Sequence, residues 1–357
     1  MTRSWSKWIP AAVVPAVIVV GALTVPLQAG AVVDLPDKSP AEVLALVAES
    51  PVRALSGTIE QTSALGLPEL PQDGPAGPSG AASVLDLLSG SHTARLYVGG
   101  AERIRSQVLD RLAERNLVRS GDEVWLYDSR DNTALHSSLS AGPGGAGPGG
   151  VPLTPAELAE RMLAAIDPST EVTVGADATV AGRSAYELVL TPRSTGTLVE
   201  SVTIAVDSET GLVLGVVLRA RGQAEPAFSL AFTALALEPP PASVFDFVPP
   251  AGATVEELAL PVGPTGWDAT DTDAAGMGGA DAGAVVVGEG WDSVVQLPAG
   301  SAPSELPTDP LFDQLTTAVP GGRLFRTALV NALFTDDGRV FAGTVPAERL
   351  QFAAIGG

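Results

Sequence analysis

The strongest constraint on the fold is a long series of short strand patterns that only two helical patterns interrupt. The helical patterns, "SPAEVLALVAES" at residues 39–50 and "TPAELAERMLAAI" at residues 154–166, each begin with a capping hydroxyl residue and a proline. A regular alternation of strands and helices, which would predict a parallel sheet, is absent. The sequence therefore predicts an α+β fold with one large curved antiparallel sheet of about eleven strands, which the helices partly close. The predicted strands are residues 55–62, 93–98, 102–109, 116–119, 123–128, 133–139, 171–177, 184–191, 198–207, 212–219 and 228–237.

Several of these strands are apolar on both faces. In "GDEVWLYDS", residues 121–129, Trp125 and Tyr127 point to one face while Val124 and Leu126 point to the other. An antiparallel strand usually has one solvated face, so something must cover the second one. Two short helices can cover only part of such a sheet. The remaining apolar surface could line a ligand cavity, or helix side chains could fill the space, and the strand pattern leaves both alternatives open.

The composition excludes several classes of function. The 357 residues include 41 acidic and 20 basic ones, and the net charge of -21 would repel nucleic acid. The chain has no cysteine and only two histidines, His92 and His136, so we expect no disulfide, no thiol chemistry and no metal site. The glycine-rich run at residues 142–150 lies inside the antiparallel meander, where it does not indicate dinucleotide binding. No pairing of a nucleophile with a base stands out, so we expect neither enzymatic activity nor a cofactor.

The first 31 residues have the order of an export signal. Arg3 and Lys7 precede an uncharged apolar run at residues 8–27, and small residues at 29–31 fit a cleavage site. We expect the mature chain to begin near Val32. The alternative is an uncleaved membrane anchor, because the uncharged run is longer than a signal needs. Either arrangement places the rest of the chain outside the cytoplasm, in the cell envelope.

Stretches rich in glycine, proline and aspartate divide the remaining sequence. We expect a ligand-binding domain at residues 32–258, a flexible linker at residues 259–284 and a small α+β domain at residues 285–357. In the small domain, the pattern predicts one strand that contains Trp291 and, later, two strands joined by an Asp-Gly turn. Its size and pattern are typical of an interaction or packing unit.

The order of these elements resembles the superfamily of the outer-membrane lipoprotein carrier LolA, the lipoprotein LppX and the sigma-E regulator RseB (MucB), in its actinobacterial members. "DEVWLYDS", "AGRSAYELVL" and "VDSETGL" carry most of the resemblance, which spans about residues 39–258. It implies an unclosed antiparallel β-barrel, with helices on its concave side, that holds the acyl chains of lipids or lipoproteins. RseB-like proteins also have a second, smaller domain after a linker. The chain departs from LppX because it has no cysteine for lipid attachment.

The resemblance and the doubly apolar strands together predict a hydrophobic hollow. One function that follows is a non-catalytic carrier or sensor that binds a lipid or an acylated protein. The alternative is an RseB-like regulator that binds a membrane-bound anti-sigma factor through its second domain. We expect the ligand to contact side chains of the strands and of a lid formed by the apolar stretch "SVLDLLSG". These candidate residues are Trp125, Tyr127, Phe228, Leu230 and Phe232 in the strands, and Leu85, Leu87 and Leu88 in the lid.

Overall fold

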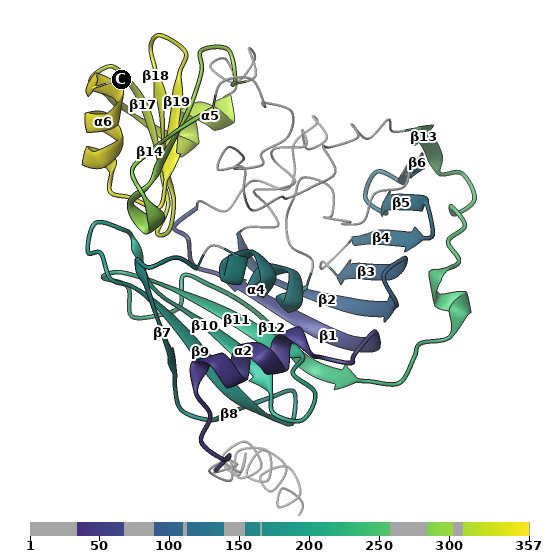
Figure 1. Cartoon of the computed structure of the whole chain (residues 1–357). Helices are drawn as coiled ribbons and strands as arrows, with labels where there is room; N and C mark the ends of the chain where they lie inside the picture. The colour runs from purple at the N-terminus through teal and green to yellow at the C-terminus, as the bar shows by residue number, and fades with distance from the viewer. Residues whose placement is uncertain are drawn as a thin grey trace, which may run out of the picture.

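A computed structural model describes most of the chain (Figure 1). The described residues are 34–67, 89–109, 113–138, 154–164, 166–257, 284–302 and 310–356. The expected export signal, the expected lid leucines Leu85, Leu87 and Leu88, and all but the last residue of the expected linker lie outside these ranges. No helix within the described ranges has both the length and the apolar character needed to cross a bilayer.

Thirteen strands form a large curved sheet (Figure 1). They are β1 (Ala54–Ser63), β2 (Gly90–Gly99), β3 (Arg103–Leu109), β4 (Glu114–Ser120), β5 (Glu123–Asp128), β6 (Thr133–Ser138), β7 (Thr170–Val174), β8 (Ala178–Val180), β9 (Arg183–Pro192), β10 (Val199–Asp207), β11 (Val213–Ala220), β12 (Phe228–Ala236) and β13 (Thr254–Glu257). Their spatial order is β13-β6-β5-β4-β3-β2-β1-β12-β11-β10-β9-β7, with β8 beside β9. Neighbours are antiparallel except for β13 and β6, which are parallel. The predicted fold class, a curved and unclosed antiparallel sheet in an α+β chain, is confirmed.

Two helices lie against one face of this sheet, which we call the inner face. Helix α2 (Pro40–Ala48) begins with a capping box, because Ser39 and Glu42 each accept a hydrogen bond from the other's backbone N–H. Helix α4 (Pro155–Ala164) begins at Thr154, whose Oγ1 accepts from the backbone N–H of Glu157 at 3.0 Å. Helix α2 contacts β7, β9 and β10, and α4 contacts β11 and β12. The helices therefore cover the half of the sheet that contains β7 to β12.

The main hydrophobic core lies between these helices and the inner face. Val43 of α2 and Leu158 of α4 pack there against strand residues from both halves of the sheet. These strand residues include Leu55 and Ile59 of β1, Leu96 of β2, Leu188 and Leu190 of β9, Val202, Ile204 and Val206 of β10, Val216 of β11, and Leu230 and Phe232 of β12. Burial of so many aliphatic side chains is the main stabilisation of the curved sheet.

The chain that follows β12 returns across the outer face of the sheet. This cover segment, residues 238–257, contains the short 3₁₀ helix η3 (Ala242–Phe245) and ends in β13. Phe245 is buried, and a Cβ added to Gly99 would lie 2.8 Å from its ring, so glycine is needed for this close approach. Arg105 of β3 donates from Nη1 to the carbonyl of Val244 at 2.9 Å. Side chains of the cover segment thus pack on the outer face.

A second sheet of six strands follows, in the order β14-β15-β19-β18-β17-β16. Its strands are β14 (Val285–Val287), β15 (Val294–Leu297), β16 (Thr316–Val319), β17 (Gly322–Arg326), β18 (Asn331–Thr335) and β19 (Val340–Gly343). Its helices are η4 (Gly290–Asp292), α5 (Pro310–Leu315) and α6 (Ala347–Gly356). Its own core contains Val294, Leu324, Leu333, Phe341, Val345, Ala347 and Leu350.

The prediction that Trp291 lies in one long strand was wrong. Gly288 and Gly290 have φ angles of 96° and 55°, which interrupt the strand and place Trp291 in η4. The Asp-Gly turn was correctly placed between β18 and β19, but the pattern merged β17 and β18, which form two separate strands.

The two sheets are in contact. The backbone N–H of Leu198, in the β9–β10 loop, donates to the carbonyl of Thr344 at 2.7 Å, and Trp291 Nε1 donates to Thr170 Oγ1 at 2.8 Å. Leu329, in the β17–β18 loop, is buried in the core of the large sheet rather than in the core of its own sheet. The second sheet is therefore joined to the first by polar contacts and by an inserted apolar side chain.

Candidate ligand-binding surface

A row of leucines crosses the inner face of the large sheet. Leu117, Leu126 and Leu135 are direct cross-strand partners on β4, β5 and β6. Direct partners in antiparallel strands share a face. Through Ser106 of β3, the register continues to Leu96 of β2, which is in the core under the helices. Leu117, Leu126 and Leu135, which we call the leucine row, therefore belong to the inner face.

The leucine row lies beyond the part of the sheet that the described helices cover. Helices α2 and α4 contact strands between β7 and β12, whereas the row lies on β4 to β6. Leu117, Leu126 and Leu135 are half-buried, unlike Leu96, which is 1 % exposed. The apolar inner face thus has a packed half and a second half whose leucines retain accessible surface.

The outer face of the same strands explains why "DEVWLYDS" is apolar on both sides. Trp125 and Tyr127 pair with Val118 and Asn116 of β4, and they point away from the leucine row. Phe247 of the cover segment packs on both rings, with ring centroids 5.6 Å from Trp125 and 5.9 Å from Tyr127. Of the two pairs in this strand, Val124 and Leu126 are therefore the pair on the inner face.

The other strand residues expected at the hollow lie in the packed half. Leu230 and Phe232 are only 4 % and 2 % exposed, and Phe228 is half-buried against the same core. Phe228, Leu230 and Phe232 thus lie together on the inner face. Trp125 and Tyr127 lie on the opposite, outer face of the sheet. Contact with a ligand stays a prediction for all five residues.

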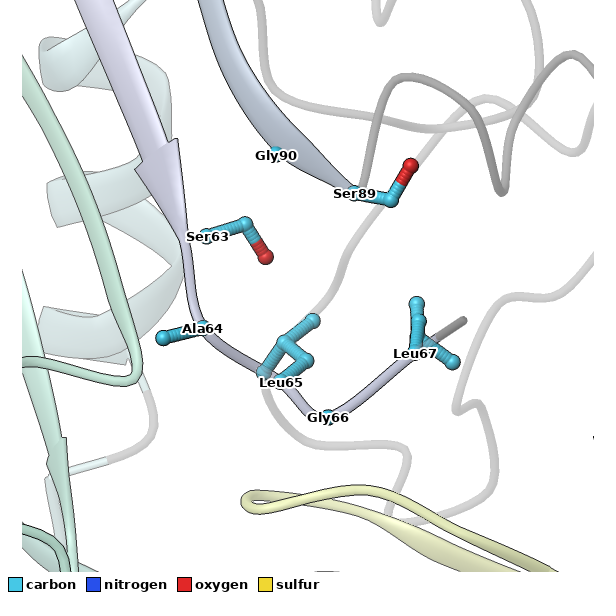
Figure 2. A pocket seen from close by; sticks show the side chains of 7 residues that line it. All are labelled: Ser63, Ala64, Leu65, Gly66, Leu67, Ser89 and Gly90. Atoms are coloured by element: carbon cyan, nitrogen blue, oxygen red, sulfur yellow. The ribbon is translucent and has the colours of Figure 1, made fainter. Parts of the chain in front are cut away.

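A pocket of about 320 Å³ opens where β1 ends and β2 begins (Figure 2). Its lining is mostly main chain and small side chains: Ser63, Ala64, Leu65, Gly66, Leu67, Ser89 and Gly90. The carbonyl of Leu65 accepts a hydrogen bond from Ala328 of the second sheet at 2.9 Å, so the pocket lies next to the contact between the sheets. Its volume is at the lower end for a small-molecule site, and Ala64, Leu65 and Leu67 supply its apolar side chains.

The charged groups near the leucine row are few. Arg115 and Arg119 flank Leu117 on the inner face, and Asp128 is the direct partner of Arg115. Arg119 donates from Nε to the carbonyl of Gly121 at 3.1 Å. Within the described ranges, no cluster of three or more acidic or histidine side chains could hold a metal ion. This arrangement suits the binding of an apolar group.

Sequence reasoning named Leu126 as a neighbour of the aromatic pair but did not single out Leu117 or Leu135. The signal was present, because each of the three short strands has one leucine near its middle. The turns between the strands, at residues 121–122 and 129–132, bring these leucines into one row. The alternation of each strand was readable, but the register between strands was needed to place the leucines together.

Comparison with protein-family models gives no match, and no curated protein sequence matches. Several solved structures are similar to the chain. The Pseudomonas aeruginosa MucA/MucB complex contains a chain 16 % identical, covering 88 % of this chain and 96 % of that chain at a TM-score of 0.43. An uncharacterized conserved protein from Thermus thermophilus is 13 % identical, covering 61 % and 98 % of the two chains at a TM-score of 0.36. A LolA superfamily protein from Nitrosomonas europaea is 11 % identical, covering 59 % and 99 % at a TM-score of 0.26.

MucB and the LolA superfamily are also the proteins that the sequence motifs resemble. At these identities and TM-scores, the likenesses carry no argument about the ligand or the partner of this chain.

Proposed function

We propose that this chain is a non-catalytic, extracytoplasmic binding protein that holds acyl chains of a lipid or an acylated protein against the leucine row, as a carrier or a sensor. The observation that carries the proposal is the register of Leu117, Leu126 and Leu135 on the inner face, where they stay half-buried. The leucine row is continuous with the main core through Leu96. An acyl chain along it would extend the core outward rather than open a new apolar site.

The hydrophobic effect is large enough for such binding. Each methylene removed from water contributes about 0.8 kcal/mol, so ten buried methylenes would contribute roughly 8 kcal/mol before the costs of association. No charged contact is needed for useful affinity. In this arrangement Leu230 and Phe232 form the packed wall of the hollow, because side chains of the core already surround them.

The test is binding of a fluorescent fatty acid to the delipidated protein, with displacement by an unlabelled fatty acid. Leu126→Asp should weaken binding by at least about tenfold, because it places a charge beneath the bound chain. Thr203→Asp is the matched control, since Thr203 is also half-buried but lies on the outer face of β10. A charge at Leu230 or Phe232 would disrupt the folded core itself and could not separate binding from stability.

A second candidate function, binding of an anti-sigma factor, has support from the second sheet. Phe352 and Ile355 of α6 are 71 % and 86 % exposed, and an exposed apolar pair of this kind can mark a protein contact. The same experiment separates the two functions. If folded, delipidated protein binds no acyl probe at any concentration up to its solubility, the lipid-binding proposal fails and the protein-binding function takes its place.

A further inference from the structure

His136 lies between two carboxylates at the edge of the large sheet. Its Nδ1 lies 3.0 Å from Oε1 of Glu257, in β13, and its Nε2 bonds to Oε2 of Glu123, in β5. Its ring stacks on Trp125, with the ring centroids 4.2 Å apart. We call His136, Glu123 and Glu257 the His136 clamp.

The His136 clamp requires a specific protonation state. An ionised carboxylate only accepts hydrogen bonds, so each ring nitrogen must carry a hydrogen to donate. Both orientations of the ring lead to the same requirement, because both nitrogens face a carboxylate. A neutral imidazole has one N–H and can satisfy only one glutamate, whereas the imidazolium satisfies both. The aromatic face of Trp125 also attracts a cation.

The strand that the His136 clamp holds has few other contacts. All four residues of β13 are exposed, and among the described strands it pairs with β6 alone, at the edge of the sheet. Two further hydrogen bonds of 2.9 Å, from the N–H of Thr254 to the carbonyl of Asn132 and from Asn132 Nδ2 to the carbonyl of Gly252, fix its start. Beyond β13, the next described element is β14 of the second sheet.

We propose that the His136 clamp is a pH-sensitive device that fixes β13, and with it the end of the cover segment, to the sheet edge in acid and loosens it as the pH rises. The charged groups facing His136 are Glu123 from β5 and Glu257 from β13. The residues that follow His136 along the same face of β5 and β4, Trp125 and Val118, are uncharged.

The direction of the effect follows from linkage. Hydrogen bonds first to Glu257 and then to Glu123 raise the pKa of His136 above its ordinary value, against a smaller opposing effect of burial. A histidine whose pKa is higher in the folded state stabilises that state fully below its unfolded pKa of about 6.5. This stabilisation is lost as the pH rises through the higher folded pKa.

The first experiment is an NMR titration of the histidines in the full chain. The chain has only two, so His92→Gln assigns the remaining signal to His136. Glu257→Gln should lower the titration midpoint of His136, because it removes the carboxylate with the larger effect. The control is Glu256→Gln on the same short strand, whose residue pairs with Leu135 instead of His136 and should leave the midpoint unchanged.

The second experiment is hydrogen exchange of residues 254–257, corrected for the intrinsic pH dependence of exchange. Protection of these amides should fall severalfold between about pH 5.5 and pH 8.5, with the midpoint of the His136 titration, while strands β9 to β11 keep theirs. In His136→Gln the fall should be absent. Protection that is equal at both pH values in the unsubstituted protein, or a His136 midpoint unaffected by Glu257→Gln, overturns the proposal.

Discussion

Among single residues, Asp207 is the most deeply buried charge in the described ranges, at 0 % exposed. Arg183 of β9 donates to it twice, from Nε to Oδ1 at 3.0 Å and from Nη2 to Oδ2 at 2.8 Å. The N–H and Oγ1 of Thr210 bond to the same carboxylate. This bidentate pair connects β9 to the β10–β11 hairpin, and it is the reason that a carboxylate can be fully buried at the end of β10.

Removal of Arg183 should therefore destabilise the fold much more than the loss of a surface charge. Arg183→Met leaves the Asp207 carboxylate buried without its cation, and we expect a loss of about 3 kcal/mol in the free energy of unfolding by urea. Glu209→Gln is the control, because Glu209 bonds to the same guanidinium but is 78 % exposed at its side chain. Equal effects of the two substitutions would contradict the importance of the buried pair.

At the scale of elements, the β10–β11 turn is positioned against α2. Gly211 ends this turn with a φ of 68°, and a Cβ at this position would lie 2.0 Å from the carbonyl oxygen of Leu46. Sequence reasoning placed the hairpin turn at residues 207–211, since "DSETG" is a turn signal. The approach of α2 to this turn is a tertiary contact, and no local pattern contains it.

Gly211→Ala tests this contact, with Gly182→Ala as the matched control. Gly182 has a similar φ of 75° but no atom within 4 Å of the added Cβ, so only its backbone strain of about 1 kcal/mol applies. Gly211→Ala adds the collision with Leu46 and should cost at least about 1 kcal/mol more in chemical unfolding. Similar losses for the two variants would show that α2 moves away without cost.

Local patterns predicted most elements of the large sheet because alternation and turn residues determine them nearly alone. Both helices were placed from their caps, and β5 and β6 were placed from alternation. Two strands were missed for physical reasons. β8 has only three residues. β13 is the exposed sequence "TVEE", and its parallel pairing with β6 joins segments more than a hundred residues apart in the sequence. The leucine row was missed because a row across three strands is a property of register.

On the scale of the whole molecule, the contact between the sheets could not be predicted. The expected division at residues 259–284 stays a prediction, but the core of the large sheet includes Leu329 and Trp291 from beyond it. Leu329 is 6 % exposed, while its neighbour Val330 is 42 % exposed. Nothing in "TALVNAL" distinguishes these two side chains, because the difference depends on the surface against which the loop packs.

Leu329→Asp should therefore loosen the second sheet from the first without unfolding either one. The residue belongs to the core of the large sheet and not to the core of the second sheet, so the second sheet keeps its own apolar contacts. We expect a larger radius of gyration by small-angle X-ray scattering and faster proteolysis between residues 258 and 284. Loss of the contact should also expose the amide of Ala328, which bonds to Leu65, to hydrogen exchange.

Val330→Asp introduces the same charge one residue away on the exposed side, and it should leave all three measurements unchanged. Identical behaviour of the two variants would mean that the polar contacts at Leu198 and Thr170 hold the sheets together without the inserted leucine.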